Sequence, residues 1–285
     1  MGGKWVGTEK CGSRLKQKGD VKMNELDNDV GVGAKGLKNT NFLIRGGESD
    51  NALNFIKVPN ELIYDKDIDS IAFVIYSYIL FNKNDYGGSY LKTGDILKCY
   101  YGKMPKRSPK LIDRIMNVLF LMQDKEYFDF DTNDVFDNKI LFSENKVVDI
   151  VVLDNCYLKK KYTTICFSDF QKIMLYSKPN ELDTNLRVFL YICSFMNSSR
   201  KDGVSCAFFR SLDKAIKSLN ISKPTLSNSI TFLCSDECCV LKKHTTGIGH
   251  TNIYVLNNFN ADEEIQKALD QIKKMREKSN DNNEE

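Results

Sequence analysis

The residues best suited to chemistry lie between positions 211 and 256, where side chains typical of DNA-contacting surfaces follow one another closely. In the segment ISKPTLSNSITFL (221–233), a lysine, an asparagine and several hydroxyl residues stand near the start of a predicted helix. Lysine reaches phosphate or guanine, asparagine can bond both edge atoms of adenine, and hydroxyls bind either partner. Basic residues and histidines follow on a predicted ribbon. The candidate DNA-binding residues of this region are Lys223, Thr225, Ser227, Asn228, Lys242, Lys243, His244 and His250.

A helix, a turn, a second helix and a two-stranded ribbon are predicted to position these side chains. Apolar residues recur at helical spacing over 212–219, which predicts a first helix with one buried face. Ser222 can cap the next helix, and Pro224 is tolerated in its first turn because the amide it lacks would have no helical partner. The ribbon is expected over 240–256. This succession is that of a winged helix-turn-helix, which puts its second helix into a DNA groove.

A second basic helix is predicted in the first half of the chain. Apolar spacing predicts a buried helix over 68–81, a shorter helix capped by Thr93, and a third helix that opens near position 106. The outer face of this third helix carries the other candidate DNA-binding residues, Lys106, Arg107, Lys110 and Arg114. The acidic segment that follows, 124–137, should avoid phosphates if it forms a wing.

The predicted fold class is α+β, with two tandem winged helix-turn-helix domains. Residues 146–153 and 162–167 are rich in Val, Ile and Thr and are predicted to be strands. We divide the chain into a disordered tail over 1–52, a first domain with the acidic segment over 53–155, a second domain over 156–259, and a charged C-terminal helix and tail over 260–285. Residues 18–22 can be encoded by a purine-rich sequence resembling a bacterial ribosome-binding site, and we hypothesise from this that translation starts at Met23.

The composition of the chain indicates where the protein is located but does not identify its binding partner. The 41 Lys and Arg residues nearly balance the 38 Asp and Glu residues, so net charge alone gives no argument for nucleic acid. No apolar run approaches the ~20 residues needed to cross a bilayer, and the N-terminus lacks the apolar core of a secretory signal. We therefore expect a cytoplasmic protein with reduced cysteines and no membrane partner.

Metal binding and catalysis are the competing interpretations of the same region. Cys234, Cys238 and Cys239, with His244 and His250 downstream, could supply four zinc ligands, but their spacing is not the usual pair of pairs. We expect packing and phosphate contacts from them instead, and no metal. The chain has no Gly-rich phosphate-binding loop and no coherent catalytic set, so we expect neither an enzyme nor a cofactor.

Two stretches of the first half carry a family resemblance. FIKVPNELIYDKDIDSIAFVIYSYIL and YLKTGDILKCYYGKMPKRSPKLIDRIMNVLFLM resemble the N-terminal winged-helix domain of replication initiator A-like proteins from Gram-positive plasmids and mobile elements. Pro59, Leu62 and Ala72 match the family's entry segment and its alanine-containing helix. The resemblance implies binding to repeated origin sequences, by a monomer or a homodimer, and recruitment of host replication proteins.

Three functions follow as hypotheses. The first is sequence-specific binding of double-stranded DNA to initiate replication of a plasmid or mobile element. The second, with the same chemistry, is a transcriptional regulator. The third is an adaptor that loads replication proteins, in which the winged helices bind protein partners and make no direct contact with DNA.

Overall fold

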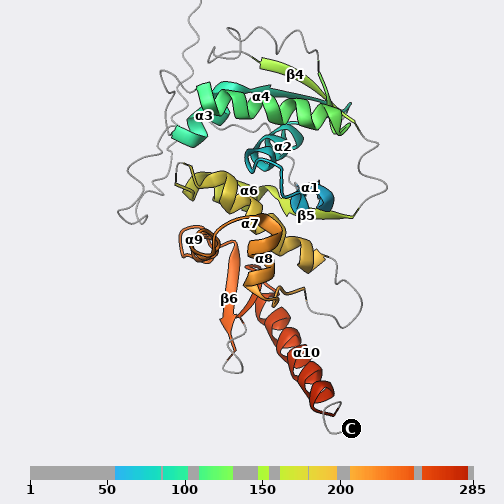
Figure 1. The fold of residues 1–285 in the computed structure, drawn as a ribbon, viewed down its shortest axis with the longest axis vertical. Coiled ribbons are helices and arrows are strands. Elements are labelled where there is room, and N and C mark those ends of the chain that lie inside the picture. Colours follow the sequence, from blue (N-terminus) through green and yellow to red (C-terminus); the bar gives the residue numbers. More distant parts are fainter. Residues whose placement is uncertain are drawn as a thin grey trace, which may run out of the picture. The chain divides into compact units, whose positions relative to one another are not determined.

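The computed structural model describes residues 55–84, 86–101, 109–130, 147–153, 161–178, 180–197, 206–246 and 252–281. The tail predicted over 1–52 lies outside these ranges. Helices and small antiparallel sheets alternate along the chain (Figure 1), which confirms the mixed α+β class. Within the described ranges, no helix combines the length and the apolar character that a membrane span requires.

The first half of the described chain begins with a strand and a short helix and continues into three longer helices and a small sheet. Its elements are β1 (Phe55–Pro59), α1 (Asn60–Tyr64), α2 (Ile71–Phe81), β2 (Gly88–Lys92), α3 (Thr93–Tyr101), α4 (Pro109–Asp124), β3 (Phe128–Asp129) and β4 (Val147–Val152). The strands β2, β4 and β3 form an antiparallel sheet in that order, with β4 in the centre. β4 alternates exposed and buried residues, so one face of this sheet packs on the core.

The second half has a similar order of elements, with an isolated bridge at Phe208 in place of a strand and an additional helix at its end. It comprises β5 (Tyr162–Cys166), α6 (Phe167–Tyr176), α7 (Leu182–Asn197), α8 (Leu212–Leu219), α9 (Lys223–Leu233), β6 (Leu241–Thr245), β7 (Asn252–Leu256) and α10 (Ala261–Asp281). Phe208, between α7 and α8, makes a bridge to Tyr254 of β7, which also pairs with β6. β7 therefore lies between Phe208 and β6, as β4 lies between β2 and β3 in the first half.

The entry strands of the two halves pair with each other. β1 and β5 run antiparallel, with Lys57 opposite Thr164 at the centre of the ladder. The short helix that follows each strand leads into a long apolar helix, and these two long helices, α2 and α7, contact one another. The two halves are thus joined by backbone hydrogen bonds as well as by packing.

The core follows from the apolar helices. Every residue of α2 from Ile71 to Leu80 is buried, as expected for a helix that is apolar on all sides. One continuous apolar cluster includes residues of both halves, among them Phe73 of α2 and Phe189 of α7. A second, smaller cluster forms where Ala261, Ile265 and Ala268 of α10 pack on β7.

Most predicted elements match those observed, with small shifts at their ends. The helix predicted over 68–81 corresponds to α2, the strands predicted over 146–153 and 162–167 correspond to β4 and β5, and the predicted C-terminal helix is α10. Thr93 begins α3 as predicted, but its hydroxyl is buried and has no hydrogen-bond partner in the part of the chain that the structure describes, so it is not the expected cap. The division near position 155 stays a prediction, although the β1–β5 ladder and the shared core cross it.

Candidate nucleic-acid interface

The turn between α8 and α9 is built by side-chain caps. Ser211 accepts a hydrogen bond from the Asp213 amide at the start of α8, and Asn220 ends this helix in the left-handed conformation, with φ of 52°. Ser222 Oγ then accepts a bond of 3.2 Å from the Thr225 amide, and Pro224 lies in the first turn of α9. The predicted start of the second helix is confirmed, because both cap residues occupy the positions that their chemistry favours.

The helix α9 has one buried face and one polar exposed face. Leu226, Ser229, Ile230 and Leu233 are buried, which fixes the helix against the core. The exposed side chains are Lys223, Pro224, Ser227, Asn228 and Thr231. No residue of α9 is acidic, so this stripe presents a cation, an amide and hydroxyls without a carboxylate. Such a surface can approach both the phosphates and the base edges of DNA.

Thr225 has a more local role than the other residues predicted on α9. It is only partly exposed, and its hydroxyl lies 2.7 Å from Ser222 Oγ. A base edge would compete with this contact. The structure therefore brings Lys223, Ser227 and Asn228 together on one surface and places Thr225 in the cap beside it.

The hairpin β6–β7 separates the predicted basic residues onto two sides. Lys243 lies opposite Tyr254, which belongs to the main core with α7 and α9, whereas Lys242 and His244 lie opposite Val255 and Ile253. Val255 and Ile253 pack beneath α10, in the smaller cluster. Because residues directly opposite in a ladder share a face, Lys243 belongs to the α9 side of the hairpin, and Lys242 and His244 belong to the α10 side.

Charges around the hairpin agree with this division. Burial raises the pKa of the Cys234 thiol, at the end of α9, to about 11, and the nearby charge of Lys243 acts in the opposite direction. Lys242, by contrast, forms a salt bridge of 2.7 Å with Asp262 in the first turn of α10. Lys243 is exposed and adds a cation next to α9, whereas the charge of Lys242 is balanced by a carboxylate. His250 lies outside the described residues.

The predicted basic face of α4 differs from that of α9. Lys106 and Arg107 lie outside the described residues, and Lys110 is exposed at the start of the helix. The other exposed side chains of this stripe include Asp113 and Asn117, so a carboxylate interrupts it. Among described residues, α9 is therefore the stronger candidate for a DNA-facing helix.

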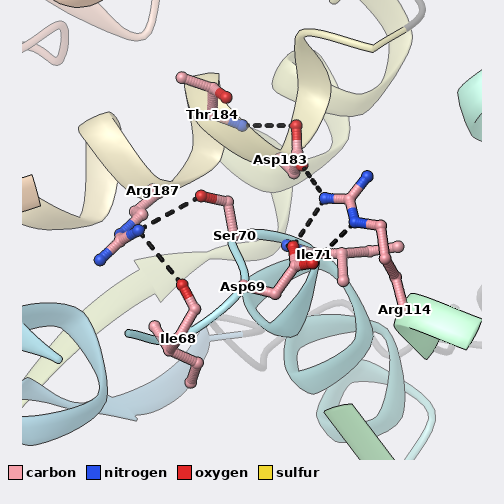
Figure 2. Close-up of polar contacts among 8 residues, drawn as sticks. All are labelled: Ile68, Asp69, Ser70, Ile71, Arg114, Asp183, Thr184 and Arg187. Atoms are coloured by element: carbon pink, nitrogen blue, oxygen red, sulfur yellow. Dashed lines mark hydrogen bonds and ion pairs between the residues drawn. The ribbon is translucent and has the colours of Figure 1, made fainter. Parts of the chain in front are cut away.

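Arg114 of α4 is paired with two carboxylates (Figure 2). Its Nε and Nη2 donate to the two oxygens of Asp69, at 2.7 and 2.6 Å, and Nη2 also donates to Asp183 at 2.8 Å. Burial acts to raise the pKa of the Asp69 carboxyl, but hydrogen bonds from Arg114 and from the Ile71 amide hold this pKa below its usual value. Arg114 was predicted from the sequence to contact DNA. A DNA phosphate would have to compete with both carboxylates for its guanidinium.

Arg187 of α7 extends this network towards the segment between α1 and α2. Its guanidinium donates to the carbonyl oxygen of Asp65 at 2.7 Å and, at 3.4 Å, to the Ile68 carbonyl and the Ser70 hydroxyl. Its side chain is buried, which lowers its pKa, while the carboxylates of Asp65, Asp69 and Asp183 oppose this effect. The two arginines and the two carboxylates Asp69 and Asp183 thus balance in charge.

Comparison of the chain with protein-family models, with curated proteins and with solved structures finds no match.

The cysteines and histidines considered as zinc ligands do not form a ligand set among the described residues. Across the described ranges, no three His, Cys, Asp or Glu side chains gather closely enough to hold one metal ion. Burial also raises the pKa of the Cys238 thiol to about 12, which disfavours the thiolate that zinc requires. Cys239 Sγ accepts a hydrogen bond from the side-chain amide of Asn257, so it has a partner at the base of the hairpin.

Sequence reasoning missed two features of this region. The opposite orientation of Lys242 and Lys243 could have been found from the alternation of side chains along a strand. The network of Asp69, Arg114, Asp183 and Arg187 had no comparable signal, since its members lie on three separate segments: the loop before α2, the helix α4 and the helix α7. Only the spacing of Asp183 and Arg187, four residues apart on α7, hinted at a shared helix face.

Proposed function

We propose that α8, α9, β6 and β7 form a winged helix-turn-helix that binds double-stranded DNA, with α9 in the major groove. The observation that supports this proposal best is the exposed stripe of α9, which combines Lys223, Ser227, Asn228 and Thr231 and contains no acidic residue. A recognition helix contacts base edges with residues near its N-terminal end. Lys223, Ser227 and Asn228 occupy this end of α9.

Each residue has a role that its chemistry suggests. Asn228 would bond adenine through its amide, and Ser227 would add a hydrogen bond to a base or a phosphate. Lys223 and Lys243 would neutralise phosphates on either side of the groove. Lys110 and Asn117 of α4 would provide a second, weaker contact, because Asp113 lies between them on the same helix.

The biological role that we propose is initiation of replication at repeated origin sites. The support for this role is the family resemblance of the first half together with the similar order of elements in the two halves. Direct repeats beside the gene, and autonomous replication of a plasmid that carries both, would test it. A neighbouring promoter bound in place of repeats would instead indicate the transcriptional regulator.

Replacing Asn228 by alanine tests the assignment of α9. We expect Asn228→Ala to relax the preference for one base position at a cost of about 1–3 kcal/mol, because the amide would no longer distinguish adenine from the other bases. The measurement is a fluorescence anisotropy titration with the preferred duplex and its single-base variants. An equal loss on every duplex would argue against base recognition by α9, and absence of any salt-sensitive DNA binding by the unmodified protein would favour the adaptor.

The two neighbouring lysines of the hairpin provide an internal comparison. Lys243→Ala should weaken binding to all sequences alike and reduce the slope of log K against log salt by about 0.9, the value for one phosphate contact. The sequence alone predicts the same behaviour for Lys242→Ala. Because Lys242 is paired with Asp262, we now expect a smaller change for this variant. Titrations at several salt concentrations would separate the two, and an equal slope change for both would contradict the assignment of faces.

A further inference from the structure

Arg114 connects the helix α4 to both halves of the molecule. It contacts Asp69, next to the start of α2, and Asp183, in the first turn of α7. We infer that Arg114 is a positioning residue that fixes α4 relative to the half carrying α9, so that the protein binds a composite DNA site with one preferred spacing. This inference rests on the proposed function.

The contacts of Arg114 have the geometry of a rigid joint. The guanidinium donates two parallel bonds to Asp69, an arrangement that fixes direction as well as distance. Asp69 Oδ1 also accepts the Ile71 amide, so this carboxylate is attached to the first turn of α2. The Asp183 side chain is buried, and its other oxygen accepts the Thr184 amide of α7. Neither acceptor can move without disturbing the start of a helix (Figure 2).

The half that carries α9 is attached to the same region through the helix α7. The helix α7 contacts α2 and α9, and it is also attached to the α1–α2 segment through Arg187. The β1–β5 ladder adds backbone bonds between the halves. A chain of packed contacts therefore leads from Arg114 through α7 to α9.

A fixed separation of two DNA-contacting helices has a measurable consequence. Each inserted base pair moves a half-site by about 3.4 Å and turns it by about 34°, since B-DNA has about 10.5 base pairs per turn. A rigid protein cannot follow this displacement at both helices, so it loses the contacts of one of them. A protein with a loosened α4 can follow it in part.

The experiment measures binding as a function of spacing. A duplex is first selected from a random-sequence library with the full chain, and hydroxyl-radical footprinting locates its two protected segments. Insertions of one to four base pairs are then placed between them. For the unmodified protein we expect a two-base-pair insertion to lower affinity about tenfold, the loss of one set of base contacts. For Arg114→Met we expect less than about a threefold difference between spacings, and for Arg114→Lys, which keeps the charge without the paired bonds, an intermediate value.

Matched variants separate this role from general stability. Lys125→Met removes a salt bridge to Asp65 that lies within the first half, and it should leave the spacing profile unchanged. If Arg114→Met does not fold, as judged by thermal melting, Asp183→Asn takes its place, because it keeps one acceptor oxygen and removes the charge together with the second acceptor. A spacing profile that is the same in the Arg114 or Asp183 variant as in the unmodified protein would overturn the inference.

The inference and the proposed function can fail separately. If the unmodified protein binds the selected duplex but tolerates every spacing equally, only the inference is overturned. If selection recovers no duplex that is bound in a salt-sensitive manner, the proposed function fails and the inference fails with it.

Discussion

Replacing Ser227 by glutamate is expected to lower the affinity for double-stranded DNA by about 100-fold or more at moderate salt. The new carboxylate would stand on the exposed stripe of α9, between Lys223 and Asn228, and α9 has no acidic residue of its own. Juxtaposed like charges cost several kcal/mol at an interface, and 100-fold corresponds to about 2.7 kcal/mol. Anisotropy titrations at two or more salt concentrations measure the loss, which should diminish as salt rises.

Asn260→Asp is the matched control for this variant. Asn260 is exposed and precedes α10, where its carbonyl oxygen accepts the Glu264 amide. An aspartate is as favourable as asparagine at such a helix start, so the variant adds one negative charge at a small cost in folding from the neighbouring acidic residues of α10. If DNA approaches α9, Asn260→Asp should change affinity only slightly. Equal losses for the two variants would mean that the effect reports net charge and that α9 is not the contact surface.

Replacing Phe208 by alanine is expected to lower the free energy of unfolding by about 3–5 kcal/mol, the usual cost of removing a buried aromatic ring. Phe208 is 1 % exposed and lies near the rings of Tyr191, Phe195 and Tyr254. Its backbone also exchanges two hydrogen bonds with Tyr254, at 2.8 and 2.9 Å. The ring thus joins the hairpin to α7, and its loss should loosen the surface formed by α9 and Lys243. Thermal melting should show a decrease of about 10 °C.

Phe259→Ala shows whether this effect comes from burial. Phe259 is 96 % exposed in the turn before α10, so truncating it removes little packing. We expect its melting temperature to stay within about 1–2 °C of the unmodified protein, since surface substitutions usually change stability by less than ~0.5 kcal/mol. A Phe208→Ala protein as stable as Phe259→Ala would contradict the packing described for the hairpin.

Local sequence signals were sufficient for the helices named above and for the cap of α9, although not for that of α3. α2 is apolar on every side, which identified a buried helix, and Ser222 with Pro224 marked the start of α9. These features depend on residues within one or two turns of each other. The exposed side chains of α9 could be predicted for the same reason, because a single buried face determines which residues remain outside.

Long-range contacts could not be read in the same way. The pairing of β1 with β5 depends on the packing of α2 against α7, and neither strand carries a residue that specifies its partner. Arg114 looked like a surface cation because its carboxylate partners lie 45 and 69 residues away in sequence. The orientation of the hairpin relative to α10 similarly depends on the small residues Ala261 and Ala268, whose role appears only once β7 lies beneath them.

The β1–β5 ladder also constrains the order of events at the ribosome. Phe55 pairs with Cys166 and Pro59 with Tyr162, so the first strand must wait until more than 100 further residues have been synthesised before its partner exists. At about 5–20 residues per second, this delay lasts several seconds or more. During it, the apolar side chains of β1 and part of α2 remain without their final cover. Between the synthesis of β1 and that of β5, the chain therefore needs protection from aggregation.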